Sequence, residues 1–324
     1  HFTDSIVLFL NHFTMMSILF IKPLRKQGDR NMLIKPIIWY SLMIFLLVWT
    51  AYGSHTRHEI PTRASSFLQS AENQNETDIL QQDQVTEGTT TYRGFLMDHV
   101  LHSETNGDIH FHLFIPESYD GSSPYALFLT LPGYEGLLFQ GVGANLYPEA
   151  YAFEAQRYHP EMIIAAPQLN DWGETSANQT IALTEYLLSH YAIDPNNVYL
   201  QGYSGGGETG SIVMGKRPEL YTAYLAVSTQ WEGDLQALVQ AQTPVYLVTG
   251  EADHYYGASQ LRETYAHLSA LYEAKGLTKA EIDDLVVLDI KPSDYFTVRG
   301  YTDQHAGGVS FAFDQTIMSW LFSR

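Results

Sequence analysis

Residues 198–207 read VYLQGYSGGG, and this stretch decides the fold that we expect. Residues 198–201 have the apolar character of a buried strand, and residues 207–216 have that of a helix. Between them stands Gly202-Tyr203-Ser204-Gly205-Gly206, a G-x-S-x-G motif at a strand–turn–helix junction. At such a junction the serine occupies a tight, strained turn that lifts its hydroxyl above the sheet. We therefore predict that Ser204 is a nucleophile, the alternative being a bystander serine in a glycine-rich turn.

The chain around this motif alternates between strand-like and helix-like segments. Asn106-Gly107, between the first two strands, is a strong signal for a β-hairpin. A hairpin that leads into a β-α-β series predicts an α/β fold with a mostly parallel central sheet, an N-terminal antiparallel hairpin and helices on both faces. We expect strands at residues 92–101, 108–115, 125–131, 162–166, 198–201, 221–227, 245–249 and 285–290, and helices at 149–158, 175–191, 207–216, 234–242, 258–274 and 311–322.

The order of these elements and the motif at Ser204 resemble the α/β-hydrolase superfamily. Within it, residues 92–324 look similar to secreted esterases grouped with polyhydroxybutyrate depolymerases, feruloyl and acetyl-xylan esterases and the catalytic domain of prolyl-oligopeptidase-like enzymes. The resemblance implies the α/β-hydrolase fold and a serine hydrolase activity. It also implies that an acidic residue and then a histidine follow the nucleophile along the chain.

The acidic residue is expected just after the strand at residues 245–249. Asp253 fits this place best, and its role would be to orient the histidine and to stabilise the imidazolium form. Glu251 is the competing carboxylate. His254-Tyr255-Tyr256-Gly257 comes next, where the superfamily often has an apolar residue and a proline, so this loop departs from the family pattern.

Three histidines follow Ser204 in the sequence. His254 lies beside the expected acid, and His267 falls in the middle of a predicted helix. His305 lies in the loop before the final helix, where the resemblance puts the base. We therefore expect His305 to take the proton of Ser204 and to return it to the leaving group.

The loop after the strand at residues 125–131 reads Pro132-Gly133-Tyr134-Glu135-Gly136. By resemblance, one backbone N–H of an oxyanion hole comes from this loop and the other from the residue after the nucleophile. These donors would be Tyr134 and Gly205. Pro132-Gly133 stands where the family commonly has His-Gly, and proline has no N–H, so the donor must lie beyond it; the alternative is an ordinary glycine turn.

Four aromatic residues are candidates for substrate binding. Trp172 and Trp231 lie in loops that follow predicted strands, and such loops should open beside Ser204 at the carboxyl end of the sheet. Tyr255 and Tyr256 follow the expected acid and are weaker candidates. Their rings could stack on a sugar or an aromatic acyl group, or they could fill space in the structure.

Composition excludes several other classes of function. The formal net charge of −19 repels nucleic acid and anionic lipid surfaces. With no cysteine, the chain cannot form disulfides, thiolate zinc sites or a cysteine nucleophile. Walker, dinucleotide and zinc-protease motifs are absent, so we expect neither cofactor nor metal. His110-Phe111-His112 could present a metal-binding pair on one strand face, but an exposed hairpin face is the preferred interpretation.

The N-terminal third of the chain has a different character from the rest. Lys35, the apolar run at 37–49 and Ala51-Tyr52-Gly53 suggest a signal peptide ending near residue 53, or else an uncleaved anchor. Residues 1–31 are interpreted as over-translated upstream sequence, or as an apolar segment at 6–21 with a basic flank. Residues 54–91 are polar and predict a disordered linker. The expectation is a secreted or extracellular protein, with a possible membrane tether, whose catalytic domain spans 92–324.

Three functions remain open from the sequence. The first is a carboxylic ester hydrolase that forms an acyl-enzyme at Ser204 and acts on a small-molecule or polysaccharide-linked ester. The second is a serine peptidase of the prolyl-oligopeptidase type, although those enzymes usually carry a propeller, for which residues 1–91 are few and polar. The third is a non-catalytic binding module that keeps the fold, against which the full set of Ser204, Asp253 and His305 argues.

Overall fold

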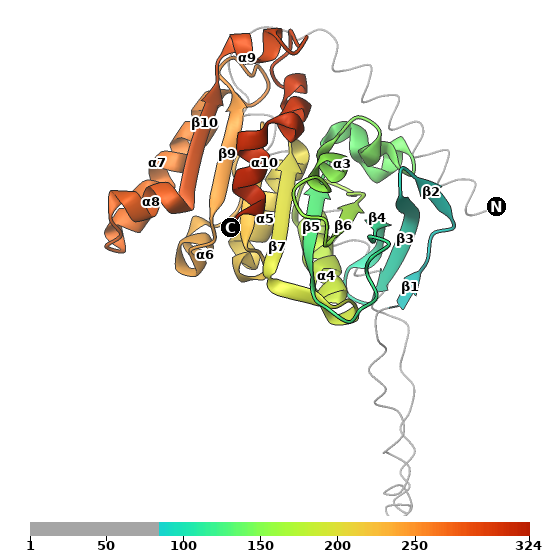
Figure 1. Ribbon diagram of the computed structural model, residues 1–324. Coiled ribbons are helices and arrows are strands. Elements are labelled where there is room, and N and C mark those ends of the chain that lie inside the picture. The colour runs from blue at the N-terminus through green and yellow to red at the C-terminus, as the bar shows by residue number, and fades with distance from the viewer. Residues whose placement is uncertain (1–83) are drawn as a thin grey trace, which may run out of the picture. The chain divides into compact units, whose positions relative to one another are not determined.

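Residues 84–324 are described by the computed structural model, and they form ten strands in one sheet (Figure 1). The predicted signal peptide or anchor at 1–53 and most of the predicted linker, residues 54–83, lie outside the described residues. The strands are β1 (Gln84–Thr86), β2 (Thr90–Tyr92), β3 (Phe95–Ser103), β4 (Gly107–Phe114), β5 (Tyr125–Leu131), β6 (Met162–Pro167), β7 (Ile193–Tyr203), β8 (Ala223–Val227), β9 (Val245–Gly250) and β10 (Val286–Lys291).

The sheet runs in the order β1-β3-β4-β6-β5-β7-β8-β9-β10, and β2 pairs with β3. The strands β3 and β4 form an antiparallel hairpin, and β4 pairs antiparallel with β6. From β6 to β10 every neighbouring pair is parallel. The prediction of a mostly parallel sheet with an N-terminal antiparallel hairpin is confirmed.

Helices cover both faces of the sheet (Figure 1). One face packs against α4 (Glu174–His190), α5 (Gly205–Lys216), α6 (Leu235–Ala241), α7 (Ala258–Ala274) and α8 (Lys279–Leu285). The other face packs against α3 (Tyr151–Ala155), α9 (Ser293–Thr297), the 3-10 segment Ala306–Phe313 and α10 (Gln315–Phe322). In β5, Leu127 and Leu129 join the first core, and Ala126 and Phe128 join the second. This alternation explains why the strand reads as a continuous apolar run.

The strand order reverses direction around β5. From β5 the chain passes to β6 on one side and then returns to β7 on the other side of β5. In an open α/β sheet, the loops after two such strands separate and leave a crevice at their carboxyl ends. The loop after β5 begins at Pro132 and the loop after β7 contains Ser204, so the topology brings these two segments together.

The sheet begins earlier than the sequence indicated. Residues 84–92, of which 84–91 were assigned to the disordered linker, form β1 and β2 and pair antiparallel with β3, as in Val85 opposite Leu101. The three residues of each strand are largely exposed, so they carry no apolar alternation that could reveal a strand. Backbone hydrogen bonds to β3 hold them in place.

The interpretation of His110 and His112 as part of an exposed hairpin face is wrong for His112. Its side chain is fully buried, on a face of β4 where the buried side chains of Asn145 and Gln168 lie close to it. Burial lowers the pKa of His112 to about 4, and its Nδ1 accepts a hydrogen bond from the Asp98 N–H at 2.9 Å. His110 pairs with the Asp98 carboxylate at 2.7 Å. Within residues 84–324 no cluster of three or more His, Asp or Glu side chains could hold a metal ion.

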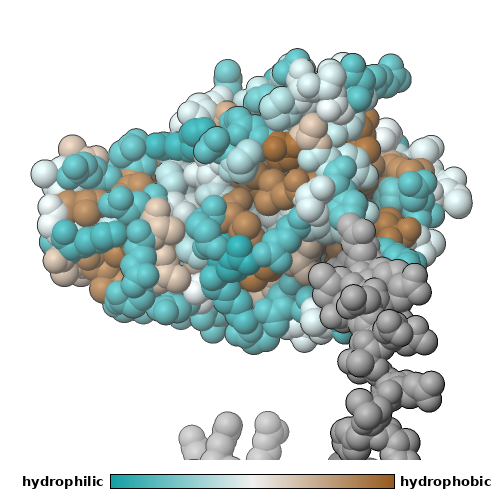
Figure 2. Space-filling view, turned by 90° about the horizontal axis from the view of Figure 1, so that it is seen from below, coloured by the Kyte–Doolittle hydropathy of each residue, from teal (hydrophilic) through white to brown (hydrophobic). Residues whose placement is uncertain are grey.

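The surface mixes hydrophilic and hydrophobic areas. On the face seen from below, hydrophobic residues gather in a central area with hydrophilic residues on either side (Figure 2). None of the helices in residues 84–324 has the length and apolar character needed to cross a bilayer.

Candidate active site

Ser204 stands at the turn between β7 and α5. Its backbone has φ 54° and ψ −124°, a conformation that costs a residue with a side chain on the order of 1–3 kcal/mol. Two hydrogen bonds hold the strained peptide units: the Ser204 N–H donates to Val227 O at 2.9 Å, and the Thr229 hydroxyl donates to Ser204 O at 2.8 Å. The side chain is 8% exposed. The turn therefore presents a nearly buried hydroxyl at the carboxyl end of the sheet.

Gly206 allows this turn to lie against the end of β5. A Cβ atom at Gly206 would lie 2.4 Å from Pro132 O and 2.5 Å from Leu131 O, both of them backbone atoms that cannot move aside. Only glycine permits so close an approach. The loop that contains Pro132 is thereby packed directly onto the first turn of α5.

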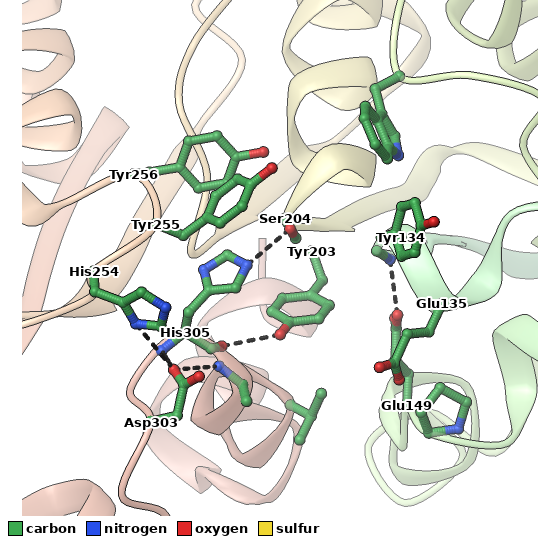
Figure 3. Close-up of a pocket in the computed structure, with 15 residues that line it drawn as sticks. Tyr134, Glu135, Glu149, Tyr203, Ser204, His254, Tyr255, Tyr256, Asp303 and His305 are labelled. Carbon is green, nitrogen blue, oxygen red and sulfur yellow. Dashed lines mark hydrogen bonds and ion pairs between the residues drawn. The ribbon is translucent and has the colours of Figure 1, made fainter.

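A chain of hydrogen bonds joins three side chains that are far apart in the sequence. Ser204 Oγ lies 2.9 Å from His305 Nε2, and His305 Nδ1 lies 2.9 Å from Asp253 Oδ2 (the first of these contacts is drawn in Figure 3). An ionised Asp253 places the imidazole proton on Nδ1, which leaves Nε2 free to accept the proton of Ser204. The arrangement can therefore raise the nucleophilicity of the Ser204 hydroxyl.

The Asp253 carboxylate is fully buried at its side chain and accepts four hydrogen bonds. Oδ2 accepts from His305 and from the Thr249 hydroxyl at 3.1 Å, and Oδ1 accepts from the N–H groups of Tyr255 and Tyr256 at 2.9 and 3.3 Å. Burial by itself raises the pKa of Asp253, but the bonds from His305, Tyr255 and Thr249 outweigh it and leave the pKa lowered. The carboxylate is thus held in its ionised form.

The imidazole of His305 is also fixed by its neighbours. The rings of Tyr203 and Tyr255 both stack on it, with centroids at 5.7 and 4.9 Å and interplanar angles of 26°. The Tyr203 hydroxyl donates to His305 O at 2.9 Å, and Asp303 Oδ1 accepts from the His305 N–H at 2.9 Å. His254 faces Asp303 at 3.4 Å. The base is therefore held in one orientation towards Ser204.

The other candidates for the acid and the base lie apart from this chain of bonds. The Glu251 carboxylate accepts from the N–H and the hydroxyl of Ser293 at 2.7 and 2.8 Å. His267 lies on α7 and lines a different cavity, together with Trp231. The prediction that Trp231 lines the pocket beside Ser204 is wrong. Its Nε1 donates to Gly233 O at 3.0 Å, and its ring packs against Tyr224.

The two predicted oxyanion donors come from the loop after β5 and from the first residue of α5. Gly205 is the first residue of α5, so its N–H has no carbonyl partner within the helix. Tyr134 begins a 3-10 turn, and within residues 84–324 neither its N–H nor that of Gly205 donates a hydrogen bond. The positive end of the α5 dipole adds to the attraction for negative charge at this place.

A cavity of about 580 Å³ opens over Ser204. Two of the predicted aromatic residues, Trp172 and Tyr255, line it, as do Tyr134 and Tyr203. Trp172 lies directly on Gly205, since a Cβ atom there would come within 2.3 Å of the indole ring. Tyr134 and Trp172 have ring centroids 5.8 Å apart. One wall of the cavity is therefore aromatic and stands beside the expected oxyanion donors.

Tyr256, a weaker candidate for substrate binding together with Tyr255, also lines the cavity. Glu149, in contrast, was not identified from the sequence as functional. It is buried and accepts a hydrogen bond from the Gly133 N–H at 2.8 Å. An acidic residue at the start of a predicted helix is a common and uninformative pattern, so nothing in the sequence distinguished Glu149.

Comparisons with known proteins agree with this architecture. A crystal structure of a thermostable esterase superposes with a TM-score of 0.58 at 21% identity, covering 71% of this chain and 63% of that one. The chain has the α/β-hydrolase fold. A structure from a study of two prolyl endopeptidases superposes on this chain with a TM-score of 0.50 at 14% identity, covering 75% of this chain but only 38% of the other.

Sequence comparison gives one family match. Residues 168–276, which contain Ser204 and Asp253, match the prolyl oligopeptidase family. Among curated proteins, none matches the sequence. The chain spans less than two thirds of the length of the esterase and of the prolyl endopeptidase with which it superposes. The segment that contains Ser204 and Asp253 is thus similar in sequence to the prolyl oligopeptidase family, and residues 84–324 share their fold with the α/β-hydrolases.

Proposed function

We propose that this α/β-hydrolase is a serine carboxylic ester hydrolase that works through an acyl-enzyme. One observation carries the proposal, namely the hydrogen-bonded chain of Ser204, His305 and Asp253 with both distances at 2.9 Å. Such a chain activates a hydroxyl that is otherwise a weak nucleophile at neutral pH. The three residues would be the nucleophile, the general base and the acid that orients the base.

In the proposed reaction, Ser204 Oγ attacks the ester carbonyl while His305 Nε2 takes the hydroxyl proton. The carbonyl oxygen becomes an oxyanion, which accepts hydrogen bonds from the N–H groups of Tyr134 and Gly205. Collapse of this intermediate breaks the bond to the alcohol, and His305 returns the proton to the departing oxygen. Water, deprotonated by His305, then attacks the acyl-enzyme. The bond between Ser204 Oγ and the acyl carbon breaks, the acid is released, and His305 returns the proton to Ser204 Oγ.

Ester hydrolysis makes the smaller chemical demand on this site. An alkoxide or phenoxide leaves more readily than an amine, which must be protonated by His305 before it departs. The parts required for an ester are a nucleophile, a base and two oxyanion donors, and the proposal assigns these roles to Ser204, to His305 and to the N–H groups of Tyr134 and Gly205. The match of residues 168–276 to the prolyl oligopeptidase family favours a second candidate, peptide hydrolysis at the same serine.

A paired assay tests the proposal. Wild-type protein is offered p-nitrophenyl acetate and butyrate in one series and peptide p-nitroanilides in the other, and the release of chromophore is followed in each. We expect turnover of the esters, an initial burst of p-nitrophenol that reports the acyl-enzyme, and a kcat/KM for esters far above that for anilides. Faster cleavage of anilides would instead identify a peptidase.

The matched controls are two serine variants. Ser204→Ala should lose more than a thousandfold in kcat and should not react with a fluorophosphonate probe, because removing the nucleophile eliminates the covalent route. Ser259→Ala, on the exposed side of α7, should behave like the wild type. If Ser204→Ala retains activity within a hundredfold, the proposed mechanism is wrong.

A further inference from the structure

Glu149 occupies an unusual place for a carboxylate. Its side chain is only 6% exposed, yet it lines the cavity over Ser204, and no lysine or arginine of residues 84–324 pairs with it. One of its oxygens, Oε1, accepts the Gly133 N–H at 2.8 Å (Figure 3). Burying a carboxyl group without an opposite charge costs free energy. We therefore asked which function Glu149 serves at this position.

The partner of Glu149 belongs to the loop that supplies an expected oxyanion donor. Gly133 lies between Pro132, which has no N–H, and Tyr134. Its N–H has no hydrogen bond with any other residue in 84–324. Gly133 packs against the nucleophile turn as well, since a Cβ atom there would lie 3.1 Å from the Tyr203 ring and 3.4 Å from Ser204 Cβ.

Two hydrogen bonds together set the direction of the Tyr134 N–H. That N–H belongs to the peptide unit whose carbonyl is Gly133 O, and this carbonyl accepts from the Gly136 N–H at 3.0 Å. In a planar trans peptide the N–H points opposite to the C=O. Glu149 fixes the peptide unit just before this one, through the Gly133 N–H. With both neighbouring units held, the Tyr134 N–H has little freedom to turn away from the oxyanion position.

We propose that Glu149 is a positioning residue, which holds the Pro132–Gly136 loop so that the Tyr134 N–H can stabilise the oxyanion formed at Ser204. The proposal rests on the proposed ester hydrolysis and goes beyond it, because it gives a function to a side chain that does not touch the reacting atoms. Its contribution is made in the transition state, where the oxyanion exists, and not in substrate binding.

The protonation of Glu149 is compatible with this role. Burial, with a contribution from Glu135, raises the pKa of Glu149 to about 8, although the bond from Gly133 opposes the shift. The protonated carboxyl still has a carbonyl oxygen that accepts the Gly133 N–H. Glutamine, which has the same shape and a carbonyl oxygen but no charge, should therefore replace Glu149 in this role, whereas leucine, of similar size, should not.

The test compares Glu149→Gln and Glu149→Leu in the full chain, with p-nitrophenyl acetate as substrate and an aryl trifluoromethyl ketone as inhibitor. The ketone adds to Ser204 and places an oxyanion where the transition state has one. We expect Glu149→Leu to lose about tenfold to a hundredfold in kcat with KM unchanged, as misplacing one donor would require. Its Ki for the ketone should rise by the same factor, and Glu149→Gln should match the wild type in both.

Each other outcome overturns the proposal. A rise in KM alone would make Glu149 a substrate contact, and equal losses in both variants would mean that the carboxyl chemistry matters rather than the hydrogen bond to Gly133. Unchanged inhibition of Glu149→Leu, when the wild type binds the ketone, refutes only the role of Glu149. A wild type that forms no adduct at Ser204 refutes the proposed hydrolysis, and the positioning role with it. Thermal unfolding of the variants checks that the leucine variant is folded.

Discussion

Replacing Asp253 with asparagine should reverse the tautomer of His305, and the structure shows why. Asp253 Oδ1 accepts from two backbone N–H groups, those of Tyr255 and Tyr256, which can only donate. The amide oxygen of asparagine must therefore keep this position. The amide NH₂ then takes the place of Oδ2 and faces His305 Nδ1 and the Thr249 hydroxyl. As a donor, it requires Nδ1 to accept, so the imidazole proton moves to Nε2.

An imidazole with its proton on Nε2 cannot accept the proton of Ser204. Because the geometry is otherwise preserved, the loss should come from the tautomer alone, and we expect kcat to fall by a factor on the order of 10⁴. That corresponds to about 5 kcal/mol in the activation barrier. The Thr249 hydroxyl can accept where it now donates, so the asparagine leaves no buried group without a partner and the fold should be retained.

The assay is steady-state hydrolysis of p-nitrophenyl acetate, with circular dichroism to confirm folding. Glu251→Gln is the matched control, because Glu251 stands two residues away and its exposed carboxylate binds only Ser293. We expect the control to retain wild-type activity. An Asp253→Asn variant whose kcat lies within about tenfold of the wild type would refute the assignment of Asp253 as the residue that orients His305.

Three further predictions follow from contacts in the cavity and around it. Gly206→Ala should abolish activity and lower the melting temperature, because its Cβ would lie 2.4 Å from Pro132 O, whereas Gly173→Ala, with no atom within 4 Å, should change neither. Trp172→Ala should reduce kcat/KM for p-nitrophenyl esters by at least tenfold, because Trp172 covers Gly205, while Trp231→Phe should leave it unchanged; equal effects would contradict our placement of the pocket. Since burial raises the pKa of Glu149 from 4.5 to about 8, the folded wild type binds this proton more tightly than the unfolded chain and loses stability as the pH rises through that range. The free energy of unfolding of Glu149→Gln, measured with denaturant and compared with that of the wild type, should therefore increase by about a few kcal/mol between pH 5 and pH 8. A difference that stays constant over this range would show that Glu149 is ionised throughout.

Much of the fold could be predicted because its elements carry their own signals. The strand at Tyr125–Leu131 and the helix at Ala258–Ala274 have the predicted bounds, the first as a continuous apolar run and the second through its helical spacing. The final helix is shorter than predicted and begins at Gln315, where the Asp314 side chain caps it. The preceding residues 306–313 form a 3-10 segment containing Gly307 and Gly308, which an apolar pattern alone could not separate from the helix.

Errors arose where a tertiary contact decides the outcome. The sequence could not show that Asn145 and Gln168, which follow other strands, lie close to His112 and help to bury this face of β4. Likewise, the loop after β8 does open at the carboxyl end of the sheet, but Trp231 turns towards Gly233 and α6 instead of towards Ser204. A loop can be placed from topology, whereas the direction of one side chain within it depends on which neighbour it packs against.

In the candidate site, too, some residues could be predicted from the sequence and others only from tertiary contacts. Ser204 could be predicted from its motif at a strand–turn–helix junction, and Asp253 and His305 from the order of residues that the resemblance to the α/β-hydrolase superfamily implies. The parallel sheet brings the loops of all three to one edge. Glu149 is different, since its partner is a backbone N–H sixteen residues earlier, and a backbone donor leaves no trace in the sequence. Side chains that shape a reaction through the backbone must therefore be found from structure, and a buried carboxyl with no cation beside it is the feature by which this one can be recognised.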